Sequence, residues 1–396
     1  MSLKKTISEP EIFNISDHQI KKNQLDKEAI SIISRLIDAG YEAYIVGGFI
    51  RDSLIGVKSK DCDVATNATP EEIKEVIPKT RIIGKRFKIV HARVGKKLIE
   101  ISTFRSSGKK NIKKSNKGIL LRDNSYGSIE DDAFRRDFTI NSLYMDTKKM
   151  EIIDFVGGFR DLQSGMLKSI GESSKRFIED PVRMIRAIRF KSKLGFKLDN
   201  KLEKGIHRYR HLLSEVPSGR KYEELLKMFL TGNAFSIMTE LQNYRITEYL
   251  LPMTKNFLEG KKDRRFILNA LKDSDKRFHQ NKTLTPAFLF AVMLWPALIS
   301  KIGDMNSKKI KIPRISRIGN LLLKKHNEYC FIPKRVQSSI KEIWEIQVML
   351  LRIPEKANTT LKHKRFRAAF DFLLLREKSG ENLGGAGDWW TKKISH

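Results

Sequence analysis

The 396-residue sequence predicts an α+β fold, in which an N-terminal α/β unit on a small mixed sheet precedes an all-α remainder. Two observations support this prediction. Short apolar or alternating segments typical of strands occur between residues 43 and 104, whereas amphipathic patterns with helical spacing dominate after residue 158. The length suffices for two or three domains. We expect a polar, mobile arm over 1–26, a head over 27–160, a helical neck over 161–235 and a helical body over 236–396.

The head elements follow from local patterns. Apolar residues at helical spacing after Lys27 predict a helix that ends before Ala39-Gly40, and residues 43–46 form a short buried strand that ends at Gly47-Gly48. A second helix is expected over 49–55. The remaining predictions are strands at 62–65, 87–94 and 98–104, and a helix at 70–76.

Beyond the strands, three segments are informative. Residues 105–122 are rich in Lys, Ser, Gly and Asn, which predicts a solvated loop or, alternatively, a basic flap near a polyanion. Helices are expected over 222–230 and 235–251. The apolar stretch 286–299 is too short to span a bilayer and contains Pro296, so we expect a buried core helix.

Composition narrows the class of partner. Lys and Arg number 77 against 46 Asp and Glu, a formal net charge of +31, which predicts attraction to nucleic acid ahead of an anionic membrane surface. The two cysteines form no CxxC pair, which argues against a disulfide framework or a zinc site and fits a reducing cytoplasm. The N-terminus lacks the apolar segment of a signal peptide. We expect a cytoplasmic protein without membrane contact.

The pair Asp61 and Asp63 is the strongest candidate for chemistry. Side chains alternate along a strand, so these carboxylates project from one face while Cys62 points to the other. Carboxylate oxygens suit Mg²⁺, with Mn²⁺ as an alternative ion, and two such ions can support nucleotidyl transfer. A surface turn is the alternative interpretation, but the preceding strand-Gly-Gly-helix segment favours the functional one.

That preceding segment is suited to phosphate. Gly47 and Gly48 permit a tight turn and close backbone approach, and the following helix offers N–H donors. Arg51 lies on the first turn of that helix and can bind phosphate; a salt bridge with Asp52 or Glu42 is the alternative.

Two further carboxylates are candidates for the third acidic residue. Glu100 lies in an alternating strand, where it either ligates metal or faces solvent on an edge strand. Asp137, if helical, shares a face with Asn141; its alternative is a salt bridge with Arg135 or Arg136. The residues alone do not choose between Glu100 and Asp137.

An arginine-rich segment follows farther along the chain. Asp180 precedes Pro181 as a helix N-cap, which by itself explains the residue. Arg183 and Arg186 lie one turn apart, with Arg189 another turn on. They form either a guanidinium stripe for phosphates or a solvated helix face.

Taken together, the motifs VGGFIRD, DCDVATNATPEE, RRDFTINSLY, DFVGG and EDPVRMIRAIRF resemble the class II tRNA nucleotidyltransferase/poly(A) polymerase family of the polymerase β superfamily. The resemblance runs from about residue 42 to residue 195. It implies a polymerase β-like catalytic head, a nucleotide-binding neck and an RNA-binding body. It also implies that Asp61 and Asp63 ligate two metal ions, with Asp137 or Glu100 as the further acid, and that the incoming nucleotide contacts Gly48, Arg51, Arg136, Arg183 and Arg186. Asp180 and Arg183 match positions that contact the base in CCA-adding relatives.

The poly(A)-adding branch is favoured over its CCA-adding alternative. The segments IIGKRFKIVH, LLRDNSYGSIEDDAFRRDFTINSLY, TPAFLFAVMLW, IPKRV and KRFRAAFDFLLLRE resemble that branch. The resemblance implies addition of AMP from ATP to RNA 3′ ends, and contact with the RNA-decay machinery. The sequence departs from the branch in lacking a long Arg-rich tail after Trp389-Trp390, which puts functions of such a tail in doubt.

Overall fold

The computed structural model describes residues 9–57, 62–84, 87–106, 112–114, 120–123, 125–303, 311–353 and 357–395. The chain divides into two compact units, Met1–Tyr209 and Arg210–His396. The boundary between the units falls inside the predicted neck, so its first part belongs to the same unit as the head.

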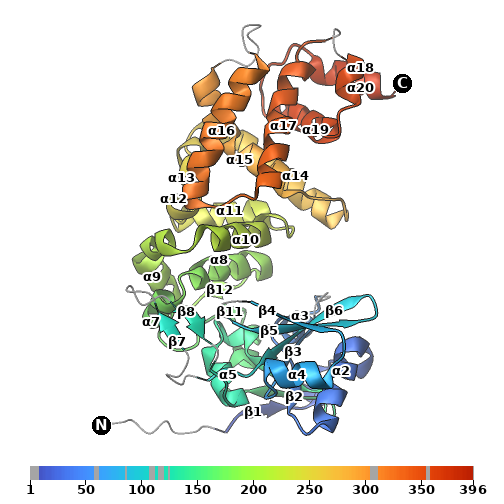
Figure 1. Cartoon of the computed structure of the whole chain (residues 1–396). Coiled ribbons are helices and arrows are strands. Elements are labelled where there is room, and N and C mark those ends of the chain that lie inside the picture. The colour runs from blue at the N-terminus through green and yellow to red at the C-terminus, as the bar shows by residue number, and fades with distance from the viewer. Residues whose placement is uncertain are drawn as a thin grey trace. The chain divides into compact units, whose positions relative to one another are not determined.

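Among the described residues, the first unit is built on an eight-stranded sheet in the order β1-β10-β9-β2-β3-β6-β5-β4 (Figure 1). β3 and β6 run parallel and the other neighbouring pairs antiparallel, which confirms the predicted mixed sheet. The sheet strands are β1 (Glu11–Phe13), β2 (Ala43–Val46), β3 (Asp63–Thr66), β4 (Thr80–Ile83), β5 (Ile89–Val94), β6 (Lys97–Thr103), β9 (Leu143–Asp146) and β10 (Glu151–Asp154).

Short helices connect these strands and continue beyond them. Three of the predicted helices, α2, α3 and α4, are found at or near the expected bounds. Two of them have a strong start signal: Asp26 caps α2, and Thr69 forms a capping box with Glu72 in α4. The helices of this unit are α1 (Ile15–His18), α2 (Lys27–Asp38), α3 (Gly48–Leu54), α4 (Pro70–Val76), α5 (Ile129–Arg135), α6 (Gly158–Gln163), α7 (Ser173–Glu179), α8 (Val182–Leu194) and α9 (Asn200–Tyr209).

The prediction of a mobile arm is wrong for residues 9–26. β1 pairs with β10 at the edge of the sheet, and Phe13 stacks on Phe159 with ring centroids 3.9 Å apart. Ile20 and Leu25 are buried. A three-residue edge strand is too short to show alternation, so the sequence pattern could not reveal it.

The expected loop over 105–122 is also corrected where the structure describes it. β7 (Ile112–Lys114) pairs antiparallel with β8 (Leu120–Asp123). A second small pairing joins β11 (Met166–Leu167) to β12 (Lys197–Leu198) in parallel.

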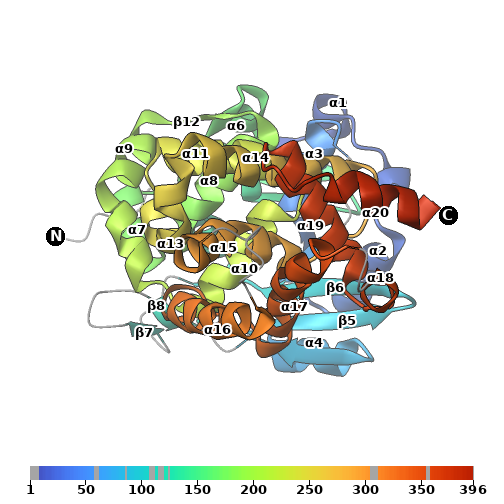
Figure 2. The ribbon, with the colours of Figure 1, turned by 90° about the horizontal axis from the view of Figure 1, so that it is seen from above.

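Every regular element described in the second unit is helical, as predicted. The helices α15, α16, α17 and α19 pack against one another (Figure 2). The helix expected over 235–251 is interrupted at residues 244–246. The helices are α10 (Ser218–Phe229), α11 (Ala234–Asn243), α12 (Thr247–Leu250), α13 (Pro252–Lys255), α14 (Lys261–His279), α15 (Pro286–Ile302), α16 (Ile312–Tyr329), α17 (Lys334–Leu350), α18 (Ala357–Leu361), α19 (Phe366–Lys378) and α20 (Ala386–Ser395).

The core of the second unit confirms the interpretation of residues 286–299 as a buried helix. α15 buries Pro296 and most of its apolar side chains. Two tryptophans satisfy their indole N–H groups inside this core: Trp344 donates to the Ala291 carbonyl at 3.1 Å and Trp390 to the Leu350 carbonyl at 2.9 Å. The described helices include none with the length and apolarity that a bilayer crossing requires.

His326 in α16 makes the stability of this core depend on pH. The residue is 1% exposed, and neither ring nitrogen has a hydrogen-bond partner among the described residues. Burial lowers the pKa of His326 to about 4. The unfolded chain binds the proton on this imidazole more tightly than the folded chain does. The free energy of unfolding therefore has its full value above the ordinary pKa of histidine and falls as the pH drops from that value to about 4.

We expect His326→Leu to remove this acid sensitivity. At about pH 4 the parent should have lost about 3 kcal/mol of its free energy of unfolding, and His326→Leu should keep it. Urea midpoints measured between neutral and acidic pH test the expectation, with His211→Leu at an exposed position as the matched control. The same pH slope in His326→Leu and in the parent would contradict it.

Candidate active site

The candidate active site is formed where β2 ends and β3 and β9 begin. Val46 pairs with Asp63 on one side and with Tyr144 on the other. Gly47 donates its backbone N–H to the Leu143 carbonyl at 3.1 Å. Because β2 runs antiparallel to both neighbours, its carboxyl end lies beside their amino ends. The sheet therefore brings together the Gly47 turn, Asp63 and the segment that precedes β9.

Glu100 joins Asp63 through the one parallel pairing of the sheet. Val64 is paired with Ile101, so the preceding residues, Asp63 and Glu100, are neighbours on the same face. Glu100 is exposed, with a carboxylate oxygen 3.3 Å from Nε2 of His91. β6, which carries Glu100, is internal to the sheet, so the alternative that Glu100 lies on an edge strand is wrong. The same alternative placed Glu100 in solvent, and this part is confirmed. Asp61 lies outside the described residues.

These carboxylates fit a hard divalent ion by their chemistry, because two acidic side chains share an accessible sheet face. Within the part of the chain that the structure describes, no group of three His, Cys, Asp or Glu is placed to enclose a metal. Cys62 is buried and points away from solvent, as the alternation predicts.

The Gly47–Gly48 turn has the predicted tight geometry. Gly47 has φ 75° and ψ −121°, a conformation that strains any residue with a Cβ. A Cβ at this position would lie 3.5 Å from the Asn141 carbonyl oxygen and 3.6 Å from Nη1 of Arg136. Backbone strain, rather than lack of space, therefore requires glycine here.

We expect Gly47→Ala to destabilise the protein by about 1–3 kcal/mol and to lower catalytic turnover, because the turn adjoins Asp63. Thermal unfolding and initial rates of the nucleotide incorporation that the family resemblance implies measure the two effects. Gly40→Ala is the matched control for strain: it has φ 89° but lies after α2, away from this turn. If Gly47→Ala were to retain full activity, the turn would not belong to the site.

A chain of polar contacts extends from this turn to the neck. Arg51 donates to Oδ1 of Asp52 at 2.6 and 2.8 Å, which is the salt bridge considered above as the alternative. It also donates to Oδ1 of Asn141 at 2.6 Å. Asn141 in turn donates to Oδ1 of Asp137 at 3.2 Å, and Nε of Arg186 donates to Oδ2 of Asp137 at 2.5 Å.

Asp137 and Asn141 make the predicted contact without the predicted helix. α5 ends at Arg135, and only a 3₁₀ turn at Thr139–Asn141 follows. Burial alone would raise the pKa of Asp137, but Arg186, Arg183 and the hydrogen bond from Asn141 hold it well below its ordinary value. Asp137 is therefore charged and paired with Arg186, and its side chain is only 10% exposed.

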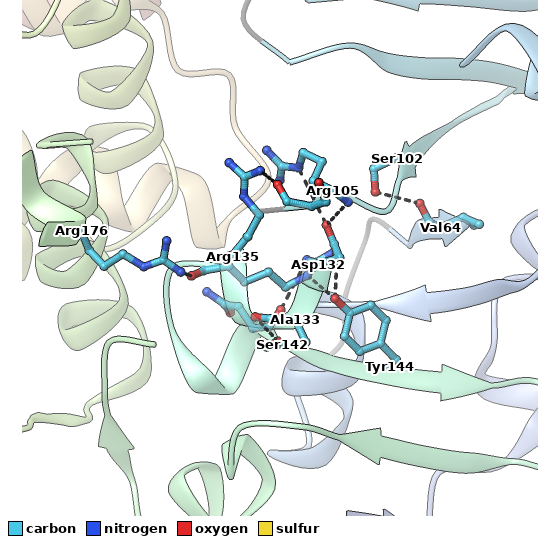
Figure 3. A network of polar contacts seen from close by, with 12 residues as sticks. Val64, Ser102, Arg105, Asp132, Ala133, Arg135, Ser142, Tyr144 and Arg176 are labelled. Carbon is cyan, nitrogen blue, oxygen red and sulfur yellow. Dashed lines mark hydrogen bonds and ion pairs between the residues drawn. The ribbon is translucent and has the colours of Figure 1, made fainter. Parts of the chain in front are cut away.

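Arg136 is engaged by two residues that the sequence analysis did not single out. Its guanidinium donates to Oδ2 of Asp132 at 2.8 Å and to the Tyr144 hydroxyl at 2.9 Å. Figure 3 shows the side chains of Asp132 and Tyr144 directed toward one another. Tyr144 donates to the same Asp132 oxygen at 2.7 Å. Burial and the Asp132 charge raise the pKa of Tyr144, so the phenol stays protonated. The i, i+4 spacing of Asp132 and Arg136 was the available signal.

Arg183 and Arg176 cap the C-terminal end of α5. Arg183 donates to the carbonyls of Arg135 and Arg136, both at 3.0 Å. Arg176 donates to the Phe134 carbonyl. These carbonyls belong to the last turn of a helix, where intrahelical donors are lacking. Burial, together with the neighbouring Arg176 charge, lowers the pKa of Arg183 to about 10.

The remaining predicted residues lie on the neck. Asp180 accepts the Val182 backbone N–H at 3.3 Å, and α8 begins at Val182, one residue later than predicted. Phe190 was missed by the sequence analysis: the guanidiniums of Arg51, Arg186 and Arg189 lie 4.9, 5.6 and 4.9 Å from its ring centroid. Guanidiniums from α3 and α8 thus gather at one aromatic ring, which favours binding of an anion nearby.

Comparisons with known proteins cover almost the whole chain. Family models described as "Poly A polymerase head domain", "Probable RNA and SrmB- binding site of polymerase A" and "Polymerase A arginine-rich C-terminus" match residues 43–168, 195–258 and 312–396. The third match shows that residues up to 396 resemble the C-terminal family region, although the sequence analysis noted no long Arg-rich tail.

Two relatives match along most of their length. Poly(A) polymerase I of Salmonella typhi is 38% identical over 95% of this chain and 84% of its own length. Poly(A) polymerase I of Haemophilus influenzae is 37% identical over 96% of this chain and 87% of its own length. A CCA-adding enzyme of Ligilactobacillus salivarius is 37% identical over 56% of this chain and 54% of its own length. Among solved structures, the Thermotoga maritima CCA-adding enzyme complexed with tRNA gives a TM-score of 0.64 at 19% identity, covering 97% and 86% of the two chains. This last similarity concerns the fold alone.

Proposed function

The chain belongs to the class II tRNA nucleotidyltransferase/poly(A) polymerase family, and on that premise we propose that it adds AMP from ATP to RNA 3′ ends without a template. It is an enzyme of the nucleotidyltransferase class. The observation that carries the choice of activity is the extent of similarity. The match to Poly(A) polymerase I spans 95% of the chain, whereas the match to the CCA-adding enzyme spans 56%.

In the proposed reaction, the RNA 3′ oxygen forms a bond to the α-phosphorus of ATP. The bond from that phosphorus to the bridging oxygen breaks, and pyrophosphate leaves. Enzymes of this family generally use divalent metal ions. We propose Mg²⁺, with Mn²⁺ as a substitute, in a two-ion site held by Asp61, Asp63 and Glu100. When bound, the ions make the 3′ hydroxyl more acidic and offset the phosphate charge.

The register supports Glu100 as the third carboxylate. It lies beside Asp63 on an accessible face, whereas Asp137 is partly buried and bonded to Arg186 and Asn141. Asp137 would instead act as a positioning residue for the arginines.

The nucleotide would be oriented by groups at the Gly47–Gly48 turn and on the neck. The guanidiniums of Arg51 and Arg186 lie 4.9 and 5.6 Å from the centroid of the Phe190 ring. Their guanidiniums would hold the triphosphate. Asp180 and Arg183 would face the base, and Arg136 would support the turn through its contact with Asp132. Contact with the RNA-decay machinery and a cytoplasmic location remain predictions.

The test is incubation of the purified chain with Mg²⁺, a labelled generic RNA and each nucleoside triphosphate separately, beside a tRNA that lacks its CCA end. Long tails on generic RNA with ATP alone would support the proposal. Extension confined to the tRNA and dependent on CTP would replace it with CCA addition. Binding of RNA should weaken steeply with salt, because Lys and Arg contacts release counterions.

A further inference from the structure

A cavity of about 500 Å³ lies inside the second unit, between α14, the start of α15 and α19. Its size falls in the usual range of small-ligand pockets. The floor is apolar and includes the buried side chains of Leu271, Leu289 and Leu375. Residues 43–168, where the proposed carboxylates lie, contribute nothing to it, so it is separate from the site described above.

Phe288 gives the cavity wall an aromatic ring in a fixed position. The residue lies on the first turn of α15, where Thr285 caps the helix by accepting the Phe288 N–H at 3.3 Å. Its ring packs edge-to-face on Phe372 with centroids 5.9 Å apart. Phe288 is only partly buried although it borders an apolar cavity. A held, accessible ring is the kind of surface on which a nucleobase stacks.

The rim is positively charged. Six lining residues are cationic and two are acidic, and Glu342 pairs from outside with Lys364 and Arg365. Six positive charges less three negative ones leave a net charge of +3. The partly buried Asp371 is shared between Arg277 and Arg367, at 3.6 and 3.2 Å, so it offsets neither cation completely. The cationic residues are Lys276, Arg277, Lys364, Arg365, Arg367 and Lys378; the acidic ones are Asp273 and Asp371.

We propose that this cavity holds one nucleotide of the bound single-stranded RNA, with the base against Phe288 and a backbone phosphate at the cationic rim. The inference rests on the proposed function, which makes RNA the substrate. An acidic peptide would satisfy the rim charge, but its carboxylates and backbone amides provide no aromatic face to stack on the ring. The combination of a single accessible ring, an apolar floor and surplus positive charge matches a nucleotide.

The experiment measures binding of a short labelled oligo(A) to the full chain without ATP. Phe288→Leu keeps an apolar side chain and removes the ring, so we expect binding to weaken about 5- to 100-fold. Phe331→Leu is the matched control, because Phe331 is 47% exposed in the same unit and does not line the cavity. An oligonucleotide of equal length with abasic sites should bind Phe288→Leu and the parent equally.

Equal binding of oligo(A) by the parent and Phe288→Leu would overturn the inference, as would an equal loss with the abasic oligonucleotide. A second variant, Lys276→Gln at the exposed rim, separates a loss of RNA binding from a folding defect in Phe288→Leu. It should lower the salt slope of RNA binding by about one unit. The proposed function has a separate failure: the parent would then not extend RNA with ATP. If the parent extends RNA and Phe288→Leu binds normally, only the cavity assignment fails.

Discussion

Asp63→Asn is expected to abolish AMP incorporation, with a loss of about 10³-fold or more in turnover. The substitution keeps the shape of the side chain and removes the charge that a divalent ion requires. Asp63 is the first residue of β3 and lies opposite Val46, so its carboxylate is held at the end of the Gly47 turn. Initial rates with saturating ATP and RNA measure the loss.

The stability of Asp63→Asn should change by less than about 0.5 kcal/mol, because the side chain is partly exposed and the strand pairing uses backbone groups. Asp38→Asn is the matched control: it removes an exposed carboxylate from the end of α2 and should leave both activity and stability unchanged. Retention of more than about a tenth of the parent activity in Asp63→Asn would remove this residue from the proposed metal site.

Asp137→Asn is expected to destabilise the first unit by about 3 kcal/mol. The change leaves Arg186 and Arg183 without the carboxylate that balances them. Loss of one partner of a buried ion pair is costly because the remaining charge stays desolvated, and the 32% exposure of the Arg186 side chain keeps the cost near the lower end of the usual range. Urea denaturation at neutral pH measures the effect.

Glu100→Gln gives the opposite pattern and is the matched comparison. Glu100 is exposed, so its loss should leave stability within about 0.5 kcal/mol while activity falls steeply. The pair of variants therefore assigns the third carboxylate. If Glu100→Gln stayed active while Asp137→Asn folded normally and lost activity, Asp137 would be the catalytic acid and the interpretation from the sheet register would be wrong.

Local sequence signals predicted the elements near the site well. The strand at Ala43–Val46 and the helix at Pro70–Val76 have the predicted bounds, because the first is a short apolar run ended by glycines and the second begins with Thr69 and a proline. β1 and β4 were missed. β9 and β10 were missed as well. β1 is too short to show a period, and the sequence analysis assigned no strand over residues 80–83, 143–146 or 151–154.

Residue contacts were predicted less completely than elements. The sequence brought Asp137 and Asn141 together through an assumed helix; the structure brings them together through a 3₁₀ turn. The sequence also assigned Arg183 either to phosphate binding or to a solvated helix face. In the structure its guanidinium donates to two backbone carbonyls at the end of α5. Contacts of this kind depend on how α8 packs against α5, which no local pattern encodes.

The sequence by itself determined the fold class, the Gly47–Gly48 turn and the family to which the chain belongs, because each depends on residues close together along the chain or on ordered motifs. Only the tertiary structure decided that Glu100 lies beside Asp63 and that Asp137 is partly buried and paired with Arg186. The physical reason is that a shift of one residue in strand pairing moves every side chain to the opposite face. Register and burial are set by the packing of the whole sheet, so the surroundings of each carboxylate follow from the folded unit.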